Sequence, residues 1–307
     1  MKTLVTLTSD SGLHHAAERS MDLALSLDPT DPSLLFRAAV MTPGVYESMN
    51  HINSTRNLLV ERIIRISDPT AGYTLTGLDE FTMSPTFYFV YQGHNDKEVL
   101  TRLQEAYVQA HPKLGFNHIL DNVDKKLYYH QYNTMLQDTT AATKSRKIRV
   151  GFVSSHFRRH SICKLFCGVM THLNPDIFDV YAFSSLQQNR EDSVTQALRS
   201  SSVNYVPIGM TFVQNRNEVT DRAIDILVYL DVGMDPSTSA WAAARLAPVQ
   251  MVIWGHPSTT GYHSIDFYLS SEKFHRHGHV NININSSLSG VGAVAAGMDR
   301  ARIISFA

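Results

Sequence analysis

The sequence predicts an α/β fold in which a parallel sheet with crossover helices follows an α-helical segment. One observation is that apolar runs of strand length recur after residue 147 and are separated by helical or loop stretches, the alternation typical of βαβ units. Another is that the residues before them carry the apolar periodicity of helices. The predicted strands are residues 148–154, 178–183, 203–208, 224–229 and 249–254.

Residues 1–66 are predicted to form a helical, tetratricopeptide-like segment. An apolar stripe over residues 16–27 stops at Asp28-Pro29, and Asp31-Pro32 supplies an N-cap and a proline at the first helical position. This pattern is typical of the end of a tetratricopeptide repeat, and an ordinary helical hairpin is the alternative. Residues 45–66 follow as a long amphipathic helix.

Residues 67–146 are predicted to be a mixed linker and helical segment. Within it, residues 87–91 form a short aromatic strand or a buried turn, and Asp96 caps a helix that ends at Ala110. The α/β lobe then occupies residues 147–272. Residues 273–307 are rich in Gly, Ala and Ser at their end, and we expect this atypical tail to lie outside the fold.

Composition narrows the class of partner and the compartment. The net charge of −1 over 307 residues gives no electrostatic reason to expect a nucleic acid or a membrane surface as partner. No apolar run approaches the roughly 20 residues of a membrane span, and no signal peptide is visible. Cys163 and Cys167 lie four residues apart on one predicted helix, a poor setting for a structural disulfide. We therefore expect a soluble protein of the cytoplasm or nucleus.

Polar loops follow three of the predicted strands. Residues 154–161 contain two histidines, two arginines and three serines, a set suited to proton transfer or to holding an anion. The alternative is that His156 and Arg158 are surface residues and only one or two members matter. Asp231 follows another strand, where it could orient a hydroxyl or a histidine or cap a helix; capping is the better assignment for Asp235, directly before Pro236.

The third loop, residues 255–261, is expected to contribute to the same ligand crevice, which in open α/β sheets lies beyond the carboxyl ends of the strands. Gly255 and Gly261 would let backbone approach a bound group closely. The donors and acceptors of this region are His256, Ser258, Thr259, Thr260 and His263.

Other chemistries are disfavoured. The sequence has no Gly-x-Gly-x-x-Gly after its first strand, no Gly-Lys-Ser/Thr phosphate loop and no Gly-x-Ser-x-Gly nucleophile elbow. The alternating His275, His277 and His279 lack a companion cysteine or carboxylate, so we expect no metal site.

Four stretches, taken together and in order, resemble the amino-terminal catalytic lobe of the O-GlcNAc transferase-like glycosyltransferases. They are residues 147–160, 223–231, 245–250 with 255–261, and 265–268. The resemblance implies a Rossmann-like lobe of a two-lobed, GT-B type enzyme. It further implies transfer of N-acetylglucosamine from UDP-GlcNAc to Ser or Thr of acceptor proteins, with no cofactor and no metal.

The resemblance also assigns residues. His160 falls on the family's active-site histidine, and Asp231 falls on a position lining the same cleft. The positions implied to bind substrate are Gly255, His256, Pro257, Thr259 and Thr260. Lys164 departs from a histidine common in animal members. In a full-length version that includes the donor lobe, His160→Ala is then expected to lower turnover about hundredfold or more, and His156→Ala, which matches no family role, much less.

Two other functions remain open: a protein O-fucosyltransferase of the sister class, which shares these motifs, and a non-catalytic protein-binding fragment. The family's second, donor-binding lobe would follow residue 272, where the tail begins instead. We therefore expect the 307-residue chain to be inactive alone. Whether the reading frame beyond codon 280 encodes a second lobe separates the enzyme from the binding fragment.

Overall fold

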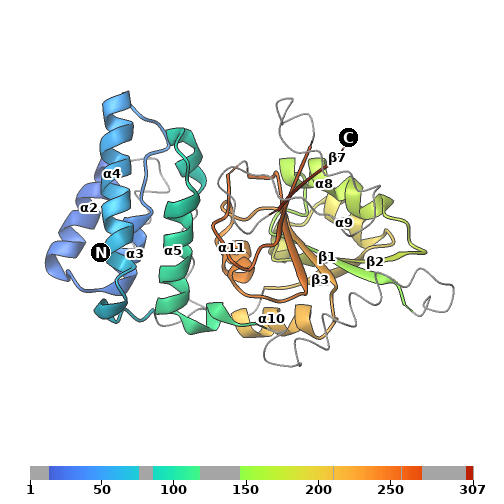
Figure 1. Ribbon diagram of the computed structural model, residues 1–307. Helices are drawn as coiled ribbons and strands as arrows, with labels where there is room; N and C mark the ends of the chain where they lie inside the picture. Colours follow the sequence, from blue (N-terminus) through green and yellow to red (C-terminus); the bar gives the residue numbers. More distant parts are fainter. Residues whose placement is uncertain are drawn as a thin grey trace. The chain divides into compact units, whose positions relative to one another are not determined.

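The computed structural model describes residues 14–75, 86–117, 146–209, 211–256, 258–271 and, for the backbone, 302–306. The chain divides into two compact units (Figure 1). Residues up to Leu114, together with residues 257–262, make a helical unit. Residues 115–256 and 263–307 make an α/β unit.

The helical unit is built from four α-helices in its described part: α2 (His14–Leu27), α3 (Pro32–Ala39), α4 (Met49–Ile66) and α5 (Lys97–Ala110). Helix α3 begins where the sequence predicts, because the Asp31 carboxylate accepts the Leu34 N–H at 3.1 Å and Pro32 occupies the first turn. Helix α4 begins later than predicted, because the N-cap is Ser48, whose hydroxyl accepts the His51 N–H.

Short 3₁₀ turns follow α4 and flank α5 along the chain: η1 (Pro69–Ala71), η2 (Phe87–Gln92) and η3 (Pro112–Gly115). The turn η2 replaces the aromatic strand that was one of the two predictions for residues 87–91. Gln92 at its end is buried and its side-chain oxygen accepts from Arg56, whose guanidinium also contacts the buried Asp96 at 2.5 Å. This paired charge ties α4 to the start of α5.

The α/β unit contains one parallel sheet with the strand order β3-β2-β1-β4-β5-β6-β7. The strands are β1 (Ile148–Ser154), β2 (Phe178–Ser184), β3 (Asn204–Pro207), β4 (Ile226–Tyr229), β5 (Val249–Ile253), β6 (Phe267–Ser271) and β7 (Arg302–Phe306). The first six have the order of a doubly wound dinucleotide-type sheet. The predicted Rossmann-like parallel sheet is therefore confirmed.

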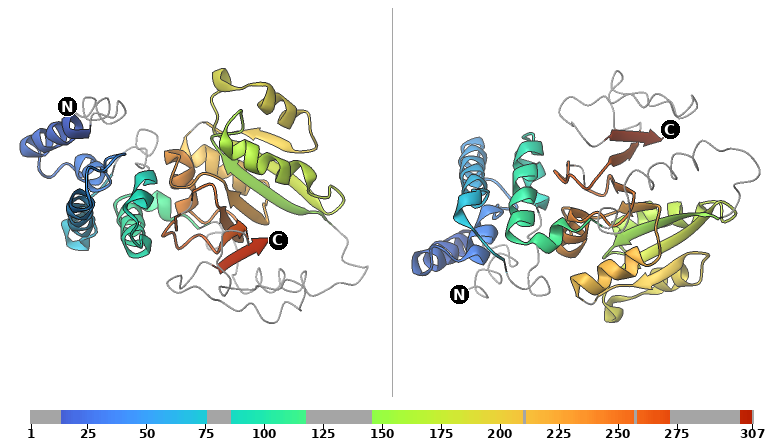
Figure 2. Two further views of the ribbon diagram at one scale, coloured as in Figure 1. Left: turned by 90° about the horizontal axis from the view of Figure 1, so that it is seen from above. Right: turned by 60° about the horizontal axis from the view of Figure 1, so that its bottom comes forward.

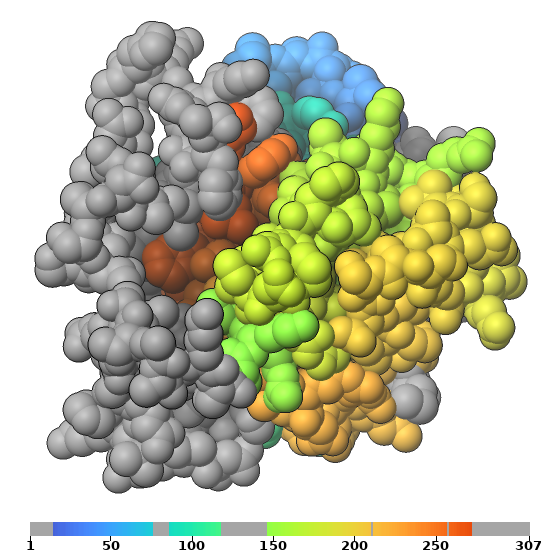
Figure 3. All heavy atoms as spheres, turned by 90° about the vertical axis from the view of Figure 1, so that its right-hand side faces the viewer, coloured from blue at the N-terminus to red at the C-terminus, as the bar shows by residue number. Residues whose placement is uncertain are grey.

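Helices cover both faces of this sheet. They are α8 (Ser161–His172), α9 (Ser193–Arg199), α10 (Phe212–Thr220) and α11 (Pro236–Ala243), with the 3₁₀ turn η5 (Gln188–Arg190) before α9. Connections between parallel strands are right-handed. The connections through α8 and α9 run from β1 toward β3, and those through α10 and α11 run in the opposite direction toward β5, so the two pairs of helices lie on opposite faces. Figures 1 and 2 show α8 and α9 beside the strands, and Figure 3 shows these two helices exposed on one face.

The two sides of β1 explain how the sheet is covered. Val150 and Phe152 pack against α8 in one apolar cluster with Phe166. The intervening Gly151 faces the other way, and a Cβ there would lie 2.8 Å from the Leu227 side chain. Successive strand residues point to opposite faces, so an apolar run without polar alternation indicates a strand covered on both sides.

Two findings correct the sequence predictions. Residues 302–306 form β7, which pairs with β6 in parallel, although no strand is predicted in the tail 273–307; residues 272–301 lie outside the described ranges. The second is a disulfide between Cys163 and Cys167, with a Cα–Cα distance of 4.7 Å. Positions four apart share one helix face, so their side chains can meet despite the poor setting expected from the sequence.

Candidate functional site

The candidate site lies at the carboxyl ends of β1 and β4, where the strand order reverses. From β1 the chain turns toward β2, whereas β4 continues toward β5 on the other side. At such a switch point the loops diverge and leave a crevice. Val153 of β1 pairs with Tyr229 of β4, so the residues that follow each strand, Ser155 and Asp231, emerge at the same level.

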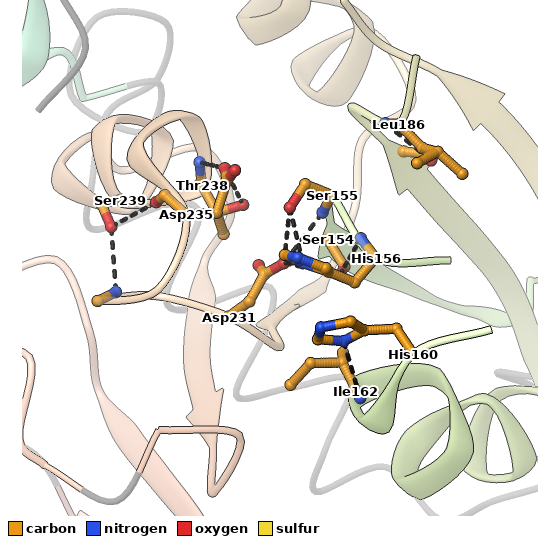
Figure 4. A network of polar contacts seen from close by, with 12 residues as sticks. Ser154, Ser155, His156, His160, Ile162, Leu186, Asp231, Asp235, Thr238 and Ser239 are labelled. Atoms are coloured by element: carbon orange, nitrogen blue, oxygen red, sulfur yellow. Dashed lines mark hydrogen bonds and ion pairs between the residues drawn. The ribbon is translucent and has the colours of Figure 1, made fainter. Parts of the chain in front are cut away.

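Asp231 is the centre of the polar network (Figure 4). The residue is fully buried, and its Oδ2 accepts hydrogen bonds from Ser154 Oγ at 2.8 Å and from the Ser155 N–H at 3.0 Å. The same oxygen lies 2.8 Å from Nδ1 of His156. Its Oδ1 has no hydrogen-bond partner among the described residues. The Ser155 hydroxyl donates to Oδ2 as well, at 3.2 Å, so Asp231 orients two hydroxyls and a histidine, one of the roles considered from the sequence.

His156 is held on two sides by the turn after β1. Its backbone N–H donates to Ser154 Oγ at 2.9 Å, and Nδ1 also lies 2.8 Å from Ser155 Oγ. The side chain is only 20% exposed. The alternative that His156 is a free surface residue is therefore wrong: the turn and Asp231 together fix its ring.

His160 lies directly beside His156 and is the N-cap of α8. Its Nδ1 accepts the Ile162 N–H at 3.3 Å, and the two histidine rings are 4.0 Å apart between centroids (Figure 4). Burial lowers the pKa of His160, and the nearby His156 and Arg158 lower it further, against the opposing charge of Asp231. The neutral imidazole is therefore favoured at this position.

Asp235 caps α11, as the sequence predicts. Its carboxylate accepts the Thr238 N–H at 2.8 Å and the Thr238 hydroxyl at 3.1 Å. Burial raises the pKa of Asp235, and the charge of Asp231 raises it further, whereas the bonds from Thr238 act in the opposite direction. The two carboxylates thus lie near each other after β4, and of the two only that of Asp231 has a hydrogen bond to a histidine among the described residues.

The loop after β5 packs against the loop after β4. His256 is buried, and a Cβ on Gly233, whose φ is +85°, would lie 2.3 Å from the His256 ring. Tyr268 donates a hydrogen bond to the His256 carbonyl at 2.8 Å, and burial raises the pKa of this phenol to about 12. A neutral tyrosine therefore fixes the backbone at His256.

The glycines predicted to approach a ligand approach the chain itself. A Cβ on Gly255 would lie 2.1 Å from the Leu230 carbonyl oxygen, and a Cβ on Gly261 would lie 2.5 Å from the backbone of Thr101. Both positions need glycine for packing between segments of the chain, which the sequence cannot distinguish from close approach to a bound group.

The remaining candidates from this loop belong to the helical unit or lie outside the described residues. Thr259 and Thr260 make local turns, accepting the N–H groups of Gly261 at 3.4 Å and Tyr262 at 3.3 Å. Ser258 donates to Asp96 of the same unit at 3.4 Å. Pro257 is outside the described ranges.

The sequence places both histidines in a loop suited to proton transfer, but the family resemblance assigns a role to His160 and Asp231 and none to His156. The available signal was positional, because both Asp231 and the 154–161 loop follow strands that are neighbours in a doubly wound order. Which histidine of that loop reaches the carboxylate depends on the conformation of the turn, which the spacing alone does not predict.

The described parts of the chain contain no cluster of three or more His, Cys, Asp or Glu side chains placed to hold a metal ion. His275, His277 and His279 lie outside those parts. Within the same ranges, no helix combines the length and apolar character needed to cross a membrane.

A carboxylate-bound histidine at the switch point of a doubly wound sheet defines the class: a Rossmann-like lobe with a site suited to proton transfer. Comparison with known families then assigns the particular one. The model of glycosyl transferase family 41 matches residues 97–276, and the chain belongs to this family. The expected likeness to O-GlcNAc transferase-like glycosyltransferases is thereby confirmed.

Individual relatives match more weakly. A probable UDP-N-acetylglucosamine–peptide N-acetylglucosaminyltransferase of Arabidopsis thaliana, SEC, is 25% identical over 128 residues, which is 41% of this chain and 13% of the relative. Among solved structures, a mutant O-GlcNAc transferase of Thermobaculum terrenum is similar at 19% identity and a TM-score of 0.39, covering 88% of this chain and 52% of that chain. The chain thus spans about half or less of the length of these proteins.

Proposed function

We propose that this protein acts in the transfer of N-acetylglucosamine from UDP-GlcNAc to serine or threonine hydroxyls of acceptor proteins. The observation that carries the proposal is the His156, His160 and Asp231 network on a lobe of glycosyl transferase family 41. A hydroxyl acceptor must lose a proton when it attacks the sugar, and histidine is the side chain best suited to take or guide a proton near neutral pH.

The residue assignments extend the proposal. His160 and Asp231 take part in catalysis, with Asp231 acting through the groups it holds. Gly255, His256, Pro257, Thr259 and Thr260 belong to the segment that receives the donor. No metal and no other cofactor is proposed, because histidine and carboxylate groups can carry the proton transfer and the leaving diphosphate is a stable anion.

A transfer assay tests the proposal. It uses the longest protein that the gene encodes, since the chain covers 13% of the length of its curated relative. Labelled UDP-GlcNAc and labelled GDP-fucose are each supplied with a library of serine- and threonine-containing peptides, and incorporated label is measured. We expect label from UDP-GlcNAc only.

Label from GDP-fucose alone would instead support the sister class, and no label from either donor, with peptides still bound, would support a protein-binding module. The same assay on the 307-residue chain tests the expectation that it is inactive alone.

The compartment that we propose is the cytoplasm or nucleus. The Cys163–Cys167 disulfide opposes this proposal, because disulfides are rare in those compartments. Fractionation of cells that express a tagged protein tests the proposed compartment.

A further inference from the structure

The two histidines of the site have opposite hydrogen-bonding constraints. Each ring has one nitrogen, Nδ1, in a hydrogen bond with the protein, while Nε2 makes no hydrogen bond to the described residues. A neutral imidazole carries one proton on its two nitrogens. What Nδ1 does therefore determines whether Nε2 is an acceptor or a donor.

Nδ1 of His156 faces an acceptor. An ionised carboxylate can only accept, so the 2.8 Å contact with Asp231 Oδ2 requires the proton on Nδ1. Ser155 Oγ is also 2.8 Å from this nitrogen. Because this hydroxyl donates its own hydrogen to Asp231 at 3.2 Å, its oxygen can accept a hydrogen bond from the same Nδ1–H. Nε2 of His156 is then unprotonated and carries a lone pair.

Nδ1 of His160 faces a donor. The Ile162 backbone N–H points at it from the first turn of α8, and a backbone N–H can only donate. The proton of the neutral ring is then on Nε2. Since burial, His156 and Arg158 lower the pKa of His160, its neutral form with an Nε2–H donor is the relevant one near pH 7.

We propose that His156 is the proton acceptor of the transfer reaction and that His160 is a hydrogen-bond donor beside it, an inference that rests on the proposed function. In this step the acceptor hydroxyl oxygen forms a bond to C1 of the sugar, and its proton moves to Nε2 of His156. The bond between C1 and the diphosphate oxygen breaks, and UDP leaves with the electron pair. The imidazolium of His156, stabilised by Asp231, then releases the proton to water.

The division of labour follows from the same geometry. A ring whose Nδ1 is bound to a buried carboxylate is oriented and is stabilised when it becomes cationic, the arrangement that makes histidine an effective base in hydrolytic triads. His160 lacks such a carboxylate contact in the described structure and uses its lone pair to cap a helix. Its Nε2–H can instead stabilise negative charge on a ligand.

The first test does not depend on activity. Long-range ¹H–¹⁵N NMR spectra of the 307-residue chain at alkaline pH report the tautomer of each histidine. We expect the Nδ1–H form for His156 and the Nε2–H form for His160. Asp231→Asn should reduce the share of the Nδ1–H form at His156 without changing His160. An Nε2–H form of His156 in the wild-type chain overturns the inference.

The second test uses turnover by the longest protein that the gene encodes. His156→Asn keeps a donor for Asp231 but has no basic nitrogen, so kcat should fall about hundredfold or more while KM for the peptide changes little. Added imidazole should restore part of kcat in His156→Ala. Retained kcat in His156→Asn overturns the assignment of the proton acceptor even when the wild-type enzyme transfers sugar.

The two failures are distinguishable. A wild-type protein that transfers no sugar from UDP-GlcNAc refutes the proposed function and, with it, the proposed proton transfer to His156. The tautomers of the two histidines are tested independently by NMR. A wild-type protein that transfers sugar, with an unaffected His156→Asn variant, refutes only the inference. Circular dichroism of each variant excludes unfolding, and imidazole rescue excludes a purely structural loss.

Discussion

Replacing Gly255 with alanine tests how tightly the loops after β4 and β5 are packed beside the site. A Cβ at this position would lie 2.1 Å from the Leu230 carbonyl oxygen and 2.9 Å from the Ile162 side chain. The isoleucine can rotate away. The carbonyl cannot, because Leu230 directly follows β4 and its N–H donates to the Val153 carbonyl at 3.1 Å.

The magnitude follows from this overlap. The loops must separate by about 1 Å to restore an ordinary contact, and forcing a methyl group into a packed interior typically costs about 1–3 kcal/mol. Because Leu230 precedes Asp231, the same movement should lengthen the 2.8 Å contact between Asp231 and His156. We therefore expect Gly255→Ala to lower the free energy of unfolding by about 2 kcal/mol and also to weaken the Nδ1–H preference of His156.

Urea denaturation of the 307-residue chain measures the effect, and Gly168→Ala is the matched control. Gly168 is exposed on α8, and nothing lies within 4 Å of its Cβ position. The same chemical change should there raise stability by about 0.5–1 kcal/mol, since glycine is a poor helix former. The packing argument is refuted if the two variants change the free energy of unfolding equally. It is also refuted if Gly255→Ala changes neither the free energy of unfolding nor the Nδ1–H preference of His156.

The remaining predictions concern titration and metals. Because the pKa of His160 is lowered in the folded chain, the unfolded chain binds the proton at a higher pH, and the free energy of unfolding should fall as the pH drops below about 6.5. His160→Asn keeps an N-cap for α8 and should flatten this dependence, which urea denaturation at a series of pH values measures. The raised pKa of Asp235 has the opposite sense: the folded chain binds the proton more tightly, so this group's contribution falls as the pH rises from about 4 through the folded-state pKa. Asp235→Asn, which keeps the cap of α11, should abolish that part of the dependence; a profile identical to wild type would contradict it. Transfer by the longest gene product should be unaffected by EDTA, and loss of activity that Mg²⁺ or Mn²⁺ restores would disprove a metal-independent mechanism.

The turnover expectation for the histidines changes with the structure. From sequence, His160→Ala is expected to cost much more activity than His156→Ala. In the structure it is His156 whose ring contacts the carboxylate of Asp231. This contact reverses the expected order of the two losses of turnover, so His156→Ala no longer serves as the control. We now expect both variants to lose turnover, with the larger loss at His156, and kcat of the two alanine variants of the longest gene product, measured side by side, checks this order.

The sequence by itself determined the Rossmann-like class and most of the strands. Residues 150–153 carry no polar side chain on either face of the strand, so helices on each side of the sheet could be predicted from this run. It also predicted the caps Asp31 and Asp235, because an Asp-Pro pair at a helix start depends on local hydrogen bonds. Strand β6 (Phe267–Ser271) was missed because its second half is polar.

Only the tertiary structure decided how the site is connected. His156 and Asp231 are 75 residues apart, and they meet because β1 and β4 are neighbours in register, a property of the sheet order that local patterns do not contain. The two histidines of one loop look alike in sequence, yet a carboxylate faces Nδ1 of one and a backbone N–H faces Nδ1 of the other. The chemical difference between them arises from the groups that folding places against each ring.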